Sequence, residues 1–184
     1  MHSLNELWRA CQKRGTTLSR EGGPSLVIGL DPGHTTGVAI LRIKPDKAPQ
    51  LHSFSELNTK ELPQGAALLH NFLQLAAFDT AKEYTDTDTD TDLIWVFVEN
   101  YRVYAKFVNQ HTWAELHTPK LIGAIQLSCH LLKLPLRLQM AHEAKSFFTN
   151  DKLQSWGIFP PAQKRHAADA LRHALHGALF NGQA

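Results

Sequence analysis

The spacing of hydrophobic and polar positions changes along the chain. Near the start, apolar residues recur at the spacing of one helix face, which predicts a short amphipathic helix over residues 4–14. From residue 25 the apolar runs become short, rich in β-branched residues and bounded by turn signals. They predict strands at residues 25–30, 37–43 and 50–55. Because short turns separate these strands, we expect consecutive antiparallel hairpins.

The second half of the chain mixes helical and continuous apolar patterns. The stretch DLIWVFVEN, residues 92–100, is typical of a strand buried on both faces, and we expect it at the centre of the sheet. A fifth strand is predicted at 136–140, with helices at 65–82, 118–132, from about 142, and at 163–180. The order predicts one α/β domain over residues 25–184, with a mixed five-stranded sheet flanked by helices. Residues 1–24 are expected to form an N-terminal appendage.

Composition limits the class of protein. The chain has 184 residues, of which 43% are hydrophobic, enough for one substantial core. No apolar run approaches the roughly 20 residues that span a bilayer, and the first 25 residues lack an apolar signal-peptide core, so we expect a cytoplasmic protein. The two cysteines, Cys11 and Cys129, are far apart, which argues against a disulfide framework or a cysteine-rich zinc site.

Charge is modest overall but uneven. The net charge is +2, and the repeat YTDTDTDTD, residues 84–92, holds four of the 17 acidic residues. Outside the repeat, the chain has 19 basic and 13 acidic residues. This excess of positive charge suits a polyanionic partner without requiring one. The repeat lacks the glycine and the terminal glutamate of an EF-hand calcium loop, so we expect a solvated insertion.

Two acidic residues end core strands. Asp31 follows the strand at 25–30, and Glu99 lies at the end of the strand at 92–100. A carboxylate buried alone is costly, and neither residue has a cation close in sequence. If their strands are neighbours, both side chains converge, and a hard divalent cation would neutralise them. His166 and Asp169, three residues apart on one face of the last helix, are candidates to complete the site.

Four segments carry a family resemblance. They are IGLDPGHTTGVAIL, VFVENYRVY, KLIGAIQLSCHLLKLPLRLQMAHEAKSFF and HAADALRHAL. Their order and approximate spacing resemble the RuvC family of Holliday-junction resolvases, in the RNase H-like superfamily, over residues 26–179. The chain looks like a short, phage-type form. The resemblance implies an RNase H-like sheet and a metal-dependent endonuclease that resolves four-way junctions by paired symmetric nicks.

The resemblance also implies a metal site. Asp31, Glu99, His166 and Asp169 match the four metal-binding positions of a two-metal phosphodiester hydrolase. We therefore expect two Mg²⁺ ions per active site. Mn²⁺ should be able to substitute, since His166 would provide a nitrogen ligand.

Basic and aromatic residues are candidates for DNA contacts. Lys145 lies in a segment that resembles the family's basic segment before its active-site helix, and further basic residues lie nearby. The family places a stacking aromatic residue after the glutamate, where this chain has Arg102 between two tyrosines. The candidate DNA-binding residues are Lys145, Lys152, Lys164, Arg165, Tyr101, Arg102 and Tyr104. The family is dimeric, which predicts a homodimer through the helix at 118–132, with Leu121, Ile122, Ile125 and Leu132 at the interface.

Plainer interpretations stay open for each residue. Asp31 can be a turn former before Pro-Gly, Glu99 a solvent-exposed strand end, and His166 an ordinary histidine at a helix start. The basic residues can be surface charges, and the tyrosines can be packing residues. Rival functions are a nuclease acting on flaps, forks or RNA–DNA hybrids, and a catalytically inactive DNA-binding scaffold. An actin- or Hsp70-like ATPase is disfavoured, because it needs two such domains and this chain has room for one.

Overall fold

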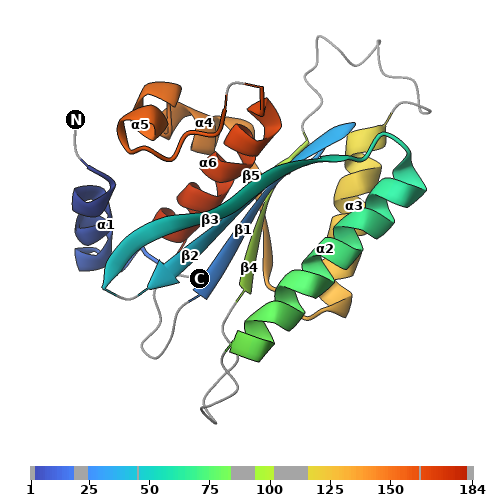
Figure 1. Ribbon diagram of the computed structural model, residues 1–184, viewed down its shortest axis with the longest axis horizontal. Helices are drawn as coiled ribbons and strands as arrows, with labels where there is room; N and C mark the ends of the chain where they lie inside the picture. Colours follow the sequence, from blue (N-terminus) through green and yellow to red (C-terminus); the bar gives the residue numbers. More distant parts are fainter. Residues whose placement is uncertain are drawn as a thin grey trace.

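The computed structural model describes residues 3–18, 25–44, 46–83, 94–101, 116–161 and 163–181. These residues form a mixed five-stranded sheet with helices on both faces, the predicted α/β architecture (Figure 1). The strands are β1 (Ser25–Asp31), β2 (Thr35–Lys44), β3 (Lys47–Asn58), β4 (Ile94–Asn100) and β5 (Leu136–Met140). The Thr-Asp repeat lies outside the described residues.

Strand order explains how two acidic strand ends meet. The sheet has the order β3-β2-β1-β4-β5. As predicted, β1 with β2 and β2 with β3 are antiparallel. The strand β4 is parallel to both of its neighbours, β1 and β5. Because β1 and β4 run in the same direction, they end at the same edge of the sheet. As predicted, the strand β4 is an interior strand and largely buried, and β1 takes the middle position in the strand order.

The helices agree with the sequence prediction except at one break. They are α1 (Leu4–Lys13), α2 (Leu62–Glu83), α3 (His117–Leu131), α4 (Ala141–Phe147), α5 (Asn150–Ser155) and α6 (Arg165–Phe180). The single helix predicted from about residue 142 is two helices, α4 and α5. The break comes at Thr149, whose Oγ1 accepts a hydrogen bond of 3.4 Å from the backbone N–H of Lys152 and caps α5.

One face of the sheet is covered by α6, with α1, α4 and α5 beside it (Figure 1). Helix α6 lies directly on the backbone of β1 and β2. A Cβ at Gly29 would overlap the carbonyl oxygen of Ala170, and one at Gly37 would overlap that of His166. Only glycine fits at these two positions. This close approach places the first turns of α6 over β1 and β2.

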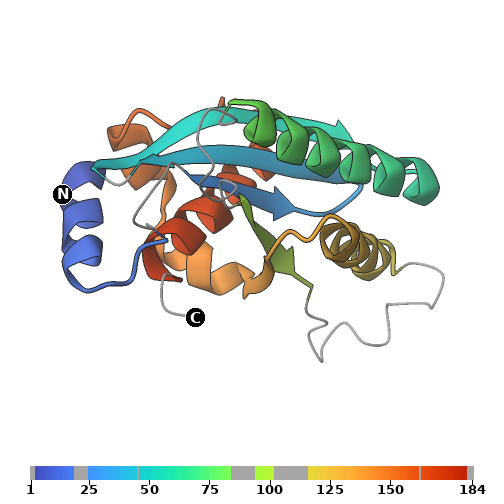
Figure 2. The same ribbon diagram turned by 90° about the horizontal axis from the view of Figure 1, so that it is seen from below.

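The opposite face is covered by α2 and α3, and Figure 2 shows these two helices away from α1. Large aliphatic side chains fill this layer, including Leu69 and Leu73 of α2. Leu121, Ile122 and Ile125, which were predicted to lie at a dimer interface, are buried in the same cluster, and Leu132 is partly buried against it. That prediction was wrong for these residues, because the apolar stripe of α3 faces the sheet.

Helix α1 packs against the α6 side through its apolar residues. Trp8 and Cys11 are buried in the core cluster that also contains the inner residues of α6. The helix begins with a capping box in which Ser3 and Glu6 exchange hydrogen bonds of 2.8 and 3.3 Å. Across the described residues, no helix combines the length and the apolar character that crossing a bilayer requires.

Candidate metal centre

Three carboxylates from distant parts of the chain meet at one edge of the sheet. Asp31 ends β1, Glu99 lies one residue before the end of β4, and Asp169 comes from the second turn of α6. Each offers one oxygen atom, and these three atoms lie within 4.8 Å of one another. Among the described residues, this is the only cluster of three or more acidic, histidine or cysteine side chains that could hold a metal. The structure thus brings together three of the four predicted ligands.

His166, the fourth predicted ligand, lies beside the cluster. Its Nδ1 is 2.7 Å from Oδ2 of Asp31, and its side chain is 48% exposed. The ring therefore contacts one member of the carboxylate group from the solvent side. A role for His166 as a metal ligand stays a prediction.

Glu56 holds the start of α6 in place. Lys164, the residue before α6, provides no side-chain cap. Instead, Oε1 of Glu56 on β3 accepts hydrogen bonds from the backbone N–H groups of His166 at 2.9 Å and Ala167 at 3.3 Å. A carboxylate at a helix N-terminus satisfies free N–H groups and interacts favourably with the helix dipole. Sequence analysis missed Glu56, because the contact joins residues 110 positions apart.

Lys145 lies between two of the carboxylates. Its Nζ is 3.0 Å from Oε2 of Glu99 and 3.0 Å from Oδ2 of Asp169. Burial alone would lower the pKa of this ammonium, but the two carboxylates outweigh it and the pKa is raised. Lys145 therefore stays charged and offsets part of the negative charge. It was predicted as a phosphate contact, and here it binds the cluster itself.

The pKa values of two of the carboxylates are shifted in opposite directions. Burial, together with the neighbouring Glu99, raises the pKa of Asp31 to about 7 despite its hydrogen bond to His166. Burial would also raise the pKa of Glu99, but hydrogen bonds and charges from His173 and Lys145 lower it to about 2. Converging carboxylate oxygens are the donor set that hard divalent cations such as Mg²⁺ and Mn²⁺ prefer.

Arg172, which sequence analysis missed, fixes Asp169. Its Nη1 donates to Oδ1 of Asp169, its Nη2 donates to Oδ1 of Asn150, and its Nε donates to the carbonyl oxygen of Phe148 at 2.7 Å. The guanidinium is nearly buried, so it orients the carboxylate rather than facing solvent. The spacing of three residues from Asp169 on a helix is the signal that could have identified it.

His173 and Gln139 lie next to Glu99. His173 is fully buried, with Nε2 at 3.0 Å from Oε2 of Glu99 and Nδ1 at 2.9 Å from Oε1 of Gln139. Gln139 on β5 pairs directly with Glu99 on β4, so both side chains point to the same face of the sheet. The spacing of four residues between Asp169 and His173 places both on one side of α6.

The other predicted DNA-binding residues have different surroundings. Lys164 and Arg165 line a hollow of about 640 Å³ together with Lys145 and Asp169. The ammonium of Lys152 donates to the carbonyl oxygen of Phe147 at 2.6 Å, and it is not among the residues that line this hollow. Tyr101 is partly buried and packs against the core on the α2 and α3 side. Arg102 and Tyr104 lie outside the described residues.

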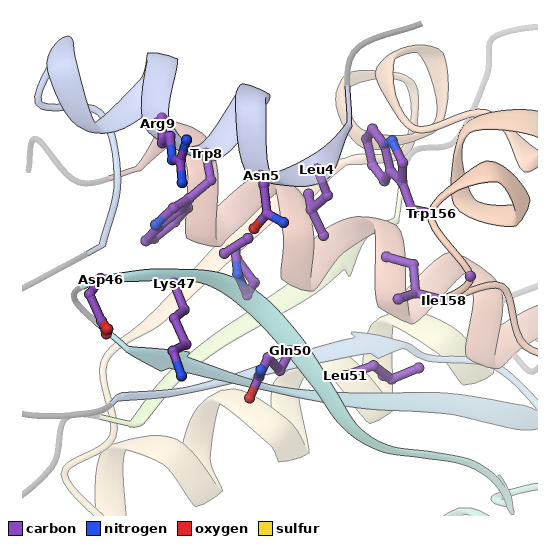
Figure 3. Close-up of a pocket in the computed structure, with 13 residues that line it drawn as sticks. Leu4, Asn5, Trp8, Arg9, Asp46, Lys47, Gln50, Leu51, Trp156 and Ile158 are labelled. Atoms are coloured by element: carbon purple, nitrogen blue, oxygen red, sulfur yellow. The ribbon is translucent and has the colours of Figure 1, made fainter.

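A larger hollow lies under α1. It has a volume of about 890 Å³ and is bounded by α1, the start of β3 and the segment after α5. Figure 3 shows Trp8 and Arg9 of α1 on one side and Lys47 and Gln50 of β3 on the other. Its lining includes none of the three carboxylates. Of these two hollows, the smaller one is lined by a carboxylate of the candidate metal centre, Asp169.

Comparisons with known proteins identify the fold. No protein-family model matches the sequence, and no curated protein matches it either. The structure is similar to Thermus thermophilus RuvC in complex with Holliday junction substrate, with a TM-score of 0.58 and 15% identity over 84% of this chain and 93% of that chain. A second Thermus thermophilus RuvC structure gives a TM-score of 0.55 and 16% identity, with the same coverage.

A third similar structure is the yeast mitochondrial Holliday junction resolvase Ydc2, with a TM-score of 0.45 and 16% identity over 94% of this chain and 91% of that chain. At these identities the two RuvC structures show the fold alone. The chain has a RuvC-like, RNase H-like fold, with a mixed five-stranded sheet and flanking helices.

Proposed function

We propose that this protein is a divalent-metal-dependent endonuclease that resolves four-way DNA junctions by paired symmetric nicks. The observation that carries the proposal is the convergence of Asp31, Glu99 and Asp169 within 4.8 Å, from two strands and a helix of a RuvC-like fold. The choice of substrate is supported by the similar Thermus thermophilus RuvC, which was solved with a Holliday junction.

The metal would be held by the three carboxylates, with His166 as a neighbouring nitrogen donor. We expect two Mg²⁺ ions per active site, with Mn²⁺ able to substitute. When bound, such ions supply an activated water and stabilise the leaving 3′ oxygen. The chain's own part is to fix the ligands, and Arg172 does so for Asp169 through a buried guanidinium.

The hollow beside Asp169 is suited to a phosphodiester. Lys145, Lys164 and Arg165 line it together with Asp169, so three positive charges surround a hollow that one of the carboxylates enters. Cations positioned this way attract the DNA backbone and orient it without reading sequence. Phosphate binding by Lys152 and stacking on junction bases by Tyr101, Arg102 or Tyr104 remain predictions.

We propose that the active form is a homodimer, because paired nicks in a four-way junction need two sites related by a two-fold axis. Helix α3 remains the candidate interface. Its exposed apolar residues are Leu127 and Leu131, with 59% and 65% of their surface accessible. These two residues replace the buried ones that the sequence suggested.

A substrate panel tests the proposal. The protein is incubated with a labelled four-way junction, a flap, a fork and an RNA–DNA hybrid, with Mg²⁺, Mn²⁺ or EDTA. We expect paired symmetric nicks in the junction with either metal and none with EDTA. The Asp31→Asn variant should bind the junction without cutting it. Preferential cutting of flaps, forks or hybrids would instead assign the rival nuclease specificity. Junction binding without any cutting by the unaltered protein would assign the inactive scaffold.

A further inference from the structure

A buried polar pair behind Glu99 has no function in the site described so far. His173 has no exposed surface and lies on the inner side of α6, among alanines and leucines that pack on the sheet. Its two ring nitrogens contact Glu99 on β4 and Gln139 on β5. Three elements are therefore joined by one imidazole ring.

Two forms of the His173 ring can donate a hydrogen bond to Glu99. If the ring is an imidazolium, both nitrogens donate, to Oε2 of Glu99 and to Oε1 of Gln139. If the ring is neutral with its proton on Nε2, Nδ1 is an acceptor, and exchanging the amide nitrogen and oxygen of Gln139 supplies the matching donor. In both arrangements an N–H from His173 is aimed at Glu99.

The hydrogen bonding of Gln139 is not the best one for stability of the fold. As placed, Nε2 of Gln139 is buried and finds no hydrogen-bond partner among the described residues. A buried donor without a partner is costly, and an apolar pair of similar size would avoid that cost. Residues that lower stability are often found next to functional sites, where they hold other side chains in a required orientation.

We propose that His173, supported by Gln139, is a positioning residue for Glu99 that fixes the carboxylate in the orientation needed to bind a divalent cation. The proposal rests on the proposed metal-dependent function. A partner that holds a ligating carboxylate from behind limits its rotation and so lowers the cost of ordering it when a cation binds. Arg172 does the same for Asp169, so adjacent residues of α6 each hold one carboxylate.

The test is Mn²⁺ binding by isothermal calorimetry, with junction cleavage as a second readout. We expect His173→Leu to weaken Mn²⁺ binding by about 10- to 100-fold, the usual effect of losing such a partner. His173→Gln should recover most of the affinity, because its amide can still donate to Glu99. Gln139→Leu should give a smaller loss in the same direction. The matched control is His176→Leu, one turn further along α6, where the ring packs against Phe180 and Mn²⁺ affinity should not change.

Two further measurements keep the proposal falsifiable. In a Glu99→Gln background, adding His173→Leu should cause no further loss of Mn²⁺ affinity, because the two changes remove the same interaction. Thermal unfolding of each variant separates folding from binding. A folded His173→Leu protein with unchanged Mn²⁺ affinity would overturn the proposal, as would an equal loss with and without Glu99. If either of these two results is obtained while the unaltered protein cuts junctions with Mn²⁺, only the positioning role of His173 is ruled out. If it binds no Mn²⁺, the proposed function fails as well.

Discussion

The two faces of the sheet are built from different residues for different purposes. On the α6 face, glycines and alanines let helix and sheet backbones touch, and charged and polar side chains reach the edge of that layer. On the α2 and α3 face, leucines, isoleucines and valines keep the helices at side-chain distance. Backbone contact fixes the position of a helix more tightly than long side chains do, because fewer rotatable bonds lie between the two elements. The difference teaches that the candidate metal centre lies on the face whose geometry is more constrained.

The largest expected effect comes from removing a carboxylate on the α6 face. Asp169→Asn should reduce junction cleavage by at least about 10³-fold, because a lost metal ligand removes several kcal/mol of transition-state stabilisation. Cleavage rates with saturating Mg²⁺ provide the measurement.

The matched control for this change is Asp151→Asn, which alters an exposed carboxylate in the first turn of α5. It should cut at nearly the normal rate. If Asp169→Asn cuts at the normal rate, Asp169 is not a metal ligand. The proposed difference in function between the two faces would then be wrong.

The second effect concerns packing and compares one glycine from each layer. Gly29→Ala should lower the free energy of unfolding by about 3 kcal/mol, because the new methyl group meets backbone atoms of α6 that cannot rotate away. Gly123→Ala on α3 has no atom within 4 Å of the added Cβ, and it should raise that free energy by about 0.5–1 kcal/mol through helix propensity. Urea denaturation measures both. Equal effects would mean that the contact between α6 and β1 leaves room for a methyl group at Gly29.

Much of this architecture was readable from residue patterns. Apolar periodicity and turn residues predicted all five strands, and the acidic residues at the ends of two buried runs predicted that Asp31 and Glu99 converge if their strands are neighbours. The parallel pairing of β1 with β4 then brought these ends together. The helix spacing of three residues put Asp169 on the correct side of α6.

The residues that hold the ligands were not readable in the same way. Glu56, Gln139 and Asn150 act across different elements, so their roles depend on how α6 docks and not on any local spacing. The dimer prediction failed for Leu121, Ile122 and Ile125 because an apolar stripe indicates burial without saying whether the partner is the sheet or a second chain. The sequence thus indicated three residues that meet in the carboxylate cluster, but not the residues that hold them in place.

The third effect is a pH dependence specific to the α6 face. In EDTA, folded Asp31 keeps its proton up to its raised pKa of about 7, whereas the unfolded chain loses it near the ordinary value of 3.8. The folded state therefore binds more protons between these values, and the free energy of unfolding should fall as pH rises. From pH 5 to pH 7 the loss should be on the order of 2 kcal/mol.

The comparison with Asp31→Asn isolates this contribution, because the amide does not titrate and the variant should lack that part of the slope. Glu99, with its pKa lowered to about 2, contributes a stability that is already complete above pH 5 and does not affect this window. Urea denaturation at several pH values gives the two slopes. Identical slopes would mean that burial and the neighbouring Glu99 do not raise the pKa of Asp31 in the folded protein.

The smallest effect on folding is expected at the outer surface of α3. Leu131→Ser removes an apolar side chain that is 65% exposed, so the free energy of unfolding should change by less than about 0.5 kcal/mol. If α3 pairs with a second copy, the same change should weaken self-association, measured by sedimentation over a range of concentrations, and should reduce paired nicking to single nicks. Gln126→Ser, at an exposed position on the same helix, is the control and should alter neither property. Unchanged self-association in Leu131→Ser would leave the α2 and α3 face with a purely structural role, which would sharpen the contrast with α6.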